Sequence, residues 1–199
     1  MSEVPNLRDF REFIEEIEHS RDSLLIKMLY LTACRVSELA GNISPSERQR
    51  GLNVYGSKLS YDVVTEENHR ILVLKIFTAK RHEFKLISLP LEEKFEPWAG
   101  ELHEFLEVAK SQPFQITRQR IWQIVNNRLS LLDPKIHPHT LRHYRLTHLV
   151  ENYGFDAYDL TVYAGWTFRT TFGQSGQLDT YLHLDWRKYF PKLLRPLIS

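Results

Sequence analysis

Three short stretches in the middle of the chain constrain its fold more than any other feature. Residues 58–64, 69–77 and 82–90 are rich in β-branched and aromatic side chains, a composition typical of β-strands. Only the short polar segments 65–68 and 78–81 separate them. Because connections this short join antiparallel rather than parallel neighbours, the sequence predicts a three-stranded antiparallel sheet, with residues 78–81 at or near a hairpin tip.

Helical spacing of apolar residues flanks these strands on both sides. Asn6 or Asp9 is a candidate N-cap for a first helix, and the nearly all-apolar residues 23–34 predict a central core helix. Thr117 is a candidate N-cap for a helix over 117–132. Further helices are predicted over 35–41, around 100–110, and over 139–153, 156–164 and 178–194. The expected fold class is therefore α+β, mostly helical with the small sheet inserted, in a single domain over residues 1–199.

The overall charge argues against one class of function. The formal net charge of the 199 residues is +1, so wholesale coating of nucleic acid by a basic protein is not indicated. Acidic residues cluster at 12–18 and 91–107, which leaves room for a local basic face elsewhere.

The single cysteine and the N-terminal residues favour a cytoplasmic protein. One cysteine, Cys34, cannot form an intramolecular disulfide, and its position after an apolar run predicts a buried structural thiol. The N-terminal residues lack the apolar stretch of a signal peptide, and no apolar run approaches the length of a membrane span. We therefore expect a cytoplasmic location and no membrane partner.

Residues 137–149, HPHTLRHYRLTHL, gather four histidines and two arginines in thirteen positions. A metal site is disfavoured: His139 and His143 share a helix face, but no Glu follows the first histidine and Arg142 lies between them. A solvated polar helix face is the commonest interpretation of such a stretch. Anion binding is the third, because His139 and Arg142 begin a helix, where free N–H groups and the helix dipole favour negative charge. Taken alone, the stretch leaves these alternatives open.

The order of motifs along the whole chain resembles that of a known enzyme family. TACRVSEL (32–39), a strand–TAKR–strand hairpin, HTLRH (139–143), AGW (164–166) and DTYLH (179–183) follow one another as in the catalytic domain of the tyrosine recombinases. This family includes the phage integrases and the Xer and Cre-like enzymes. The resemblance spans roughly residues 20–190 and implies the catalytic fold of that family.

The resemblance also implies a reaction and its residues. In the family a tyrosine attacks a DNA phosphodiester, forms a 3′-phosphotyrosyl bond and releases a 5′-hydroxyl. The bond energy is kept in the covalent intermediate, so neither ATP, a metal nor another cofactor is required. The implied catalytic residues are Arg35, Lys80, His139, Arg142, Trp166 and Tyr181.

Each of these residues has an implied role. The two arginines would stabilise the charge that grows on the phosphoryl oxygens. Tyr181 would be the nucleophile and His139 the group that helps to deprotonate it. Lys80 would protonate the leaving oxygen, and the indole N–H of Trp166 would donate a hydrogen bond to the phosphate.

Other residues compete for these roles. Arg35 can instead pair with Glu38 on a helix surface, and Arg81 or Lys85 can take the place of Lys80. The rivals of the nucleophile, of which Tyr163 is expected in the core, are Tyr153, Tyr158, Tyr163 and Tyr189. The histidines without a catalytic role are expected at peripheral, supporting or structural positions: His137, His143 and His148.

The chain departs from the family pattern in two ways. A long segment carrying Gly173 and Gly176 separates Trp166 from Tyr181, and the N-terminal DNA-clamping domain of most members is not expected here. DNA binding is therefore expected to be modest and strongly salt-dependent. Candidate phosphate contacts outside the centre are Arg48, Arg50, Arg118, Arg120 and Arg145.

The resemblance implies double-stranded DNA as the partner, with a monomer free in solution and a homotetramer, nucleoid-associated, on DNA. The tail over residues 182–199 would either cover its own core or dock into the next protomer. The expected function is site-specific recombination or integration. The alternatives are DNA relaxation of the type IB topoisomerase kind, and a DNA-binding relic that no longer cuts.

Overall fold

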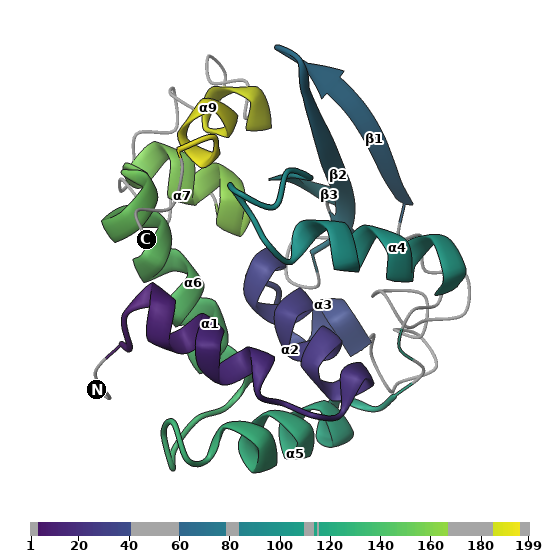
Figure 1. Cartoon of the computed structure of the whole chain (residues 1–199), viewed down its shortest axis with the longest axis vertical. Helices are drawn as coiled ribbons and strands as arrows, with labels where there is room; N and C mark the ends of the chain where they lie inside the picture. The colour runs from purple at the N-terminus through teal and green to yellow at the C-terminus, as the bar shows by residue number, and fades with distance from the viewer. Residues whose placement is uncertain are drawn as a thin grey trace.

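The computed structural model describes residues 4–40, 60–78, 84–109, 114, 116–166 and 185–195, in which helices pack with a small sheet (Figure 1). This mixture of helix and antiparallel sheet agrees with the predicted α+β class. The longer helices are α1 (Leu7–Glu15), α2 (Ser20–Thr32), α4 (Ala99–Ala109), α5 (Arg118–Leu129), α6 (Pro138–Tyr153) and α7 (Ala157–Ala164). The short helical elements are α3 (Val36–Ala40), η2 (Trp186–Lys188) and α9 (Phe190–Leu193).

The three predicted strands are confirmed as one antiparallel sheet of order β1-β2-β3. Only Glu67 and Asn68 link the first two strands, and both have positive φ, 51° and 66°. Two central residues in this conformation suit a tight hairpin, because their twist matches that of the strands. The tip between the second and third strands lies outside the described residues. The strands are β1 (Ser60–Glu66), β2 (His69–Phe77) and β3 (Phe84–Pro90).

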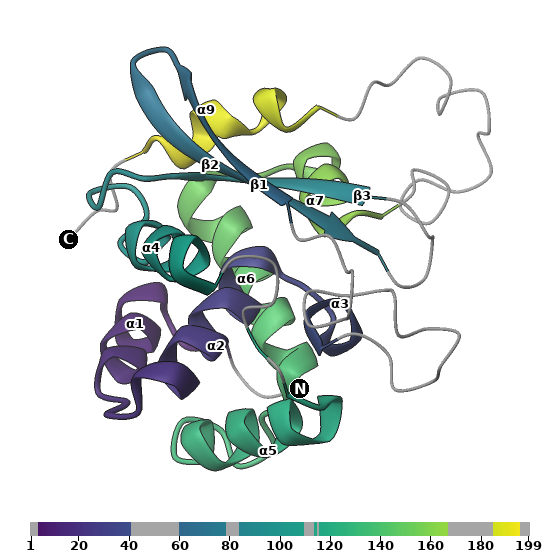
Figure 2. The same ribbon diagram turned by 90° about the vertical axis from the view of Figure 1, so that its right-hand side faces the viewer.

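The core is built around α2, as its nearly all-apolar sequence predicts. Ile26, Met28 and Leu29 have no exposed surface. Helices α1, α4, α5 and α6 all contact α2, which explains why it has no polar face. Figure 2 shows the sheet at one end of the molecule and α5 at the other.

Local capping chemistry sets the helix ends. Asn6, rather than Asp9, caps α1: its Oδ1 accepts a hydrogen bond of 2.9 Å from the backbone N–H of Asp9. The predicted cap at Thr117 is confirmed, since its Oγ1 accepts from the N–H of Arg120 at 3.2 Å. Gly154 ends α6 in the left-handed conformation, as predicted.

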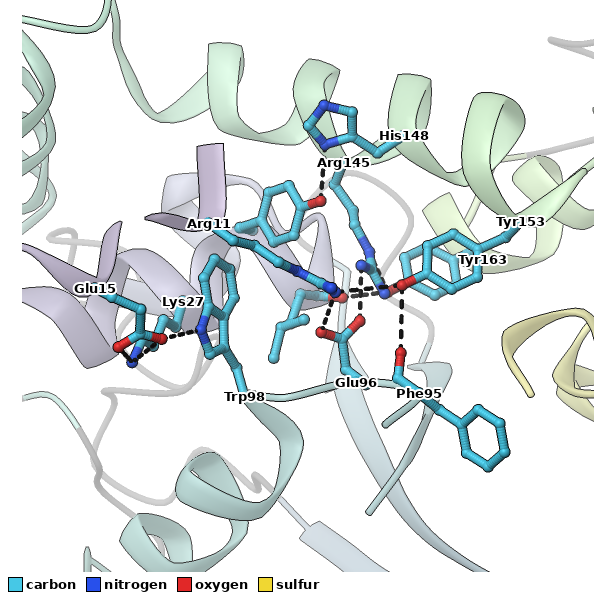
Figure 3. A network of polar contacts seen from close by, with 12 residues as sticks. Arg11, Glu15, Lys27, Phe95, Glu96, Trp98, Arg145, His148, Tyr153 and Tyr163 are labelled. Atoms are coloured by element: carbon cyan, nitrogen blue, oxygen red, sulfur yellow. Dashed lines mark hydrogen bonds and ion pairs between the residues drawn. The ribbon is translucent and has the colours of Figure 1, made fainter. Parts of the chain in front are cut away.

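A buried ion network joins distant parts of the chain (Figure 3). Glu96, 2% exposed, accepts hydrogen bonds from Arg11 at 2.8 Å and from Arg145 at 2.9 Å. Arg145 also lies over the rings of Tyr153 and Tyr163, within 5.7 and 5.6 Å of their centroids. The network fixes α1 and α6 to the segment that precedes α4.

The described part of the C-terminal tail packs on its own chain. Tyr189 is fully buried, and its Oη accepts a hydrogen bond of 3.1 Å from the backbone N–H of Ser88 in β3. Lys192 of α9 binds the N-terminal end of α7 through Asp156 and Asp159, at 3.1 Å in the case of Asp156. Residues 185–195 therefore cover the core of the same chain.

Across the described ranges, none of the helices combines the length and apolar character that crossing a bilayer requires.

Candidate functional site

Arg142 joins the ends of two helices. It lies in the second turn of α6 and is 2% exposed. Its Nη1 donates to the carbonyl oxygen of Ala33, the C-cap of α2, and its Nη2 donates at 3.1 Å to that of Ala164, the last residue of α7. Carbonyl groups at helix C-termini lack intrahelical donors and carry partial negative charge. The guanidinium therefore satisfies two backbone acceptors at the point where α2 and α7 meet.

Arg35 follows the turn that ends α2. Ala33 has φ 45°, in the left-handed region, and this turn redirects the chain into α3. The Nη1 of Arg35 donates to Oε1 of Glu38, and its backbone N–H donates to Oε2, both at 2.9 Å. The pairing between these residues, weighed as an alternative, does form, but Glu38 is buried, so the pair is more than a surface contact. The Arg35 side chain stays 32% exposed and keeps further donors for a ligand.

His139 lies beside these arginines in the first turn of α6 and is exposed. Partial burial lowers its pKa, and the positive charges of Arg142, His137, Arg35 and His143 lower it further. The imidazole is therefore neutral at neutral pH and available as a hydrogen-bond acceptor or base. His139 and Arg142 lie three residues apart at the start of α6, so both belong to the same end of that helix.

Lys85, the alternative to Lys80 for the hairpin lysine, is a buried cation. It lies in β3, is 5% exposed, and donates from Nζ to the carbonyl oxygen of Thr32 at 3.0 Å. Burial lowers its pKa, while Cys34 and Glu38 raise it and the arginines lower it again. The signal for this position was the strand alternation: residues 84 and 86 are exposed, whereas 85 and 87 face inward.

Trp166 lies next to Arg142. The centroid of its ring is 5.7 Å from the guanidinium carbon, close enough for a cation–π contact. Gly165, with φ 66°, ends α7 and lets the chain turn into this position. Four predicted site residues are thus brought together by the structure: Arg35, His139, Arg142 and Trp166.

The other histidines of the cluster have separate roles. His137 caps α6, accepting at Nδ1 from the N–H of Thr140 at 3.3 Å, and His143 is exposed. His148 is buried between Tyr30, at 2.8 Å, and the carbonyl oxygen of Pro5, at 2.7 Å. Burial lowers its pKa to about 4. Within the described ranges no group of three or more His, Cys, Asp or Glu residues is placed to hold a metal ion.

The candidate phosphate contacts divide into three groups. Arg118 and Arg120 are exposed at the start of α5. Arg145 has no exposed surface and its guanidinium is paired with Glu96, so the prediction of a phosphate contact is wrong for this residue (Figure 3). The helix pattern around it gave no warning, because its partner Glu96 comes from a distant part of the chain. Two further candidates, Arg48 and Arg50, lie outside the described residues.

Burial excludes three of the tyrosines that compete for the role of nucleophile. Lys80 and Tyr181 lie outside the described residues. Tyr163 is in the core, as predicted, and burial raises its pKa to about 12. Burial also raises the pKa values of Tyr153 and Tyr189, both of which have no exposed surface. None of these three phenols is accessible to a DNA phosphate.

The thiol of Cys34 lies under the site. It is 1% exposed and burial raises its pKa, so it remains protonated at neutral pH. This confirms the expectation of a buried structural thiol.

No protein-family model matches the sequence, and a comparison with curated proteins finds no match. The function is therefore inferred from the geometry of the site together with the sequence motifs.

Proposed function

We propose that the chain is a DNA strand transferase of the tyrosine recombinase kind, which cleaves and rejoins double-stranded DNA through a 3′-phosphotyrosyl intermediate. One observation carries the proposal. Arg35 and Arg142, far apart in the sequence, lie with Lys85 around a single turn, and the carboxylate that pairs with this group among the described residues is Glu38. Positive charge thus exceeds negative charge at a largely buried place.

A surplus of buried cations favours an anionic ligand. Buried charges are costly unless they are paired, so a site with more cations than carboxylates gains free energy from a bound anion. Arginine binds phosphate through two parallel hydrogen bonds, and its charge persists at any physiological pH. A phosphodiester fits this requirement.

The roles of the residues follow from the chemistry. Arg35, which keeps further donors, would hold the non-bridging oxygens. Arg142, whose terminal nitrogens already bind two backbone carbonyls, would add its positive charge to stabilise the charge that grows in the pentacoordinate transition state. His139, neutral because its pKa is lowered, would accept the proton of the attacking phenol. Trp166 would pack against Arg142 and the reacting phosphate.

The attacking and protonating groups are taken from the sequence motifs. Tyr181 would attack the phosphorus atom, forming the P–O bond to the tyrosine while the bond to the 5′-oxygen breaks. Lys80 would donate a proton to that oxygen. The 5′-hydroxyl of the partner strand would then attack the phosphotyrosyl bond and release the tyrosine, which balances the reaction without ATP or metal.

The tail fits a monomer free in solution. Trp186 and Tyr189 of the tail are 4% and 0% exposed, because they pack into the core of their own chain. A neighbouring chain is therefore not needed to bury these two side chains. Assembly into a tetramer on DNA is part of the proposal, as are a cytoplasmic location and a role in recombination or integration.

The test is covalent trapping on a nicked, labelled duplex in EDTA, with a supercoiled plasmid run in parallel because the target sequence is unknown. The expected result is an SDS-resistant adduct that Tyr181→Phe abolishes. An adduct that survives the substitution would mean a different nucleophile. Plasmid relaxation without strand exchange would favour a topoisomerase, and DNA binding without any adduct would favour a non-cutting relic.

A further inference from the structure

We propose that Lys85 is a positioning residue: it fixes the turn at the end of α2 and thereby holds Arg142 and Arg35 in the geometry that binds a phosphoryl group. The proposal rests on the proposed function for its phosphodiester ligand. It concerns a residue that acts through the arginines and does not touch the DNA.

The first contact is at the end of α2. The Nζ of Lys85 donates to the carbonyl oxygen of Thr32 at 3.0 Å. The next residue, Ala33, has the left-handed φ of 45° and gives its carbonyl oxygen to Nη1 of Arg142. Lys85 from β3 and Arg142 from α6 therefore bind the carbonyl groups of two consecutive residues in one turn. Arg35 follows this turn, two residues after Ala33.

The second contact is at the end of α7. A Cβ added to Gly165 would lie 3.1 Å from Cδ and 3.4 Å from Cβ of Lys85, so the lysine stem fills the space beside this glycine. The preceding residue, Ala164, gives its carbonyl oxygen to Nη2 of Arg142 at 3.1 Å. The same lysine thus borders both of the helix ends that Arg142 joins.

Its burial excludes direct catalysis by Lys85 in this arrangement. The side chain is 5% exposed and its ammonium group is bound to a backbone carbonyl. Burying an ammonium among arginines costs free energy, and apolar side chains of similar volume often replace buried charges without loss of stability. A lysine kept only for packing would therefore be replaceable by methionine without functional loss, whereas a positioning lysine would not.

The experiment compares Lys85→Met with four other variants and the wild-type chain. Arg142→Lys removes the planar fork, the double variant tests coupling, and Lys94→Met, an exposed lysine in the segment before α4, is the matched control. Lys85→Leu is carried in parallel, so that a folding failure of one variant leaves the test intact. Each protein is titrated with inorganic phosphate and assayed for adduct formation in a single turnover.

We expect Lys85→Met to change the melting temperature little, because loss of the donor to the carbonyl oxygen of Thr32 is offset by removal of a buried ammonium group. Phosphate should bind about tenfold more weakly, because the turn no longer holds Arg142 and Arg35 in place. Adduct formation should slow by on the order of 10²-fold, as for a catalytic group misplaced by an ångström. In the Arg142→Lys background the Lys85 substitution should add little, because both residues act on one turn. Lys94→Met should match the wild type.

Three results would overturn the proposal: unchanged phosphate affinity in Lys85→Met, additive effects in the double variant, or a wild-type chain that does not bind phosphate. If Lys85→Met weakens phosphate binding but the wild-type chain forms no adduct with any DNA, the strand-transfer function fails while the positioning role of Lys85 stands. The two proposals are thereby tested separately.

Discussion

The Nη2 of Arg142 lies 3.1 Å from the carbonyl oxygen of Ala164, so a side chain from the start of α6 donates a hydrogen bond to the C-terminal end of α7. A second carbonyl, that of Ala33, is bound by the other terminal nitrogen. A guanidinium used in this way stabilises the fold and at the same time is held rigidly at the site. Electrostatic stabilisation of a transition state requires such rigid placement, because the charged group then does not have to reorient during the reaction.

The first prediction concerns this double role. Arg142→Lys should lower the free energy of unfolding by about 1–3 kcal/mol, since one of the two buried carbonyl groups loses its donor. Phosphate binding should weaken with it, because a lysine cannot bind the carbonyl groups of Ala33 and Ala164 together and its charge is no longer held rigidly at the site. Urea unfolding and phosphate titration measure the two effects. Arg120→Lys, at an exposed position, is the control and should change stability by no more than about 0.5 kcal/mol.

A second prediction concerns the buried network around Glu96. Glu96→Gln should destabilise the chain by about 3–5 kcal/mol, because it leaves the buried Arg145 and the partly buried Arg11 without a carboxylate. Its affinity for DNA, measured under conditions where the variant is folded, should not change. The control is Glu12→Gln, which breaks an exposed ion pair with Arg8 and should have almost no effect. A large loss of DNA affinity in the folded Glu96 variant would mean that the network contacts the ligand after all.

A third prediction tests α5 as a phosphate-binding surface. Arg120 is exposed, and its Nη1 contacts Gln123 at 3.5 Å. Arg120→Ala should reduce the slope of log K against log salt concentration by about 1, the loss of one phosphate contact. Arg128→Ala is the comparison on the same helix, because Arg128 is paired with Asp22 at 2.8 Å and should leave the slope unchanged. Equal slopes for the wild type and Arg120→Ala would remove α5 from the DNA-binding surface.

The fourth prediction is a loss of stability in mild acid through His148. Burial lowers its pKa from 6.5 to about 4, so the unfolded chain binds a proton more readily than the folded one. The stabilisation is complete above pH 6.5 and is lost as the pH falls towards 4, by at most about 3 kcal/mol. Urea unfolding between pH 4 and 7 measures this slope. His148→Gln should flatten it, whereas the exposed His143→Gln should not; a slope unchanged by His148→Gln would assign it to other groups.

Sequence reasoning predicted the strands and most helix ends because these depend on local features. Thr117 and Gly154 cap their helices through contacts with residues close in the chain, and such contacts are visible as motifs. The environment of Arg145 is different, because its partner Glu96 comes from another part of the chain. Nothing in the helix pattern distinguishes it from Arg120, which is exposed.

The candidate site was predictable only where its residues belonged to motifs. Arg35, His139 and Arg142 were found through their motifs, but the backbone carbonyl groups that hold Arg142 belong to helix ends that meet only in the folded chain. Lys85 was visible as a competitor of Lys80. Its inward-facing position follows from the alternation of β3, which becomes informative once the phase of the strand is known.

The last prediction uses two glycines that differ in what surrounds them. Gly165 and Gly154 both end helices with positive φ, 66° and 68°, so alanine at either position should cost about 1 kcal/mol in backbone strain. A Cβ at Gly165 would press on the buried stem of Lys85, whereas at Gly154 it would meet the end of the exposed Arg195 side chain. Gly165→Ala should therefore also weaken phosphate binding, and Gly154→Ala should not. Melting curves and phosphate titrations of both variants check this, and equal phosphate affinities would mean that the end of α7 does not control the placement of Arg142.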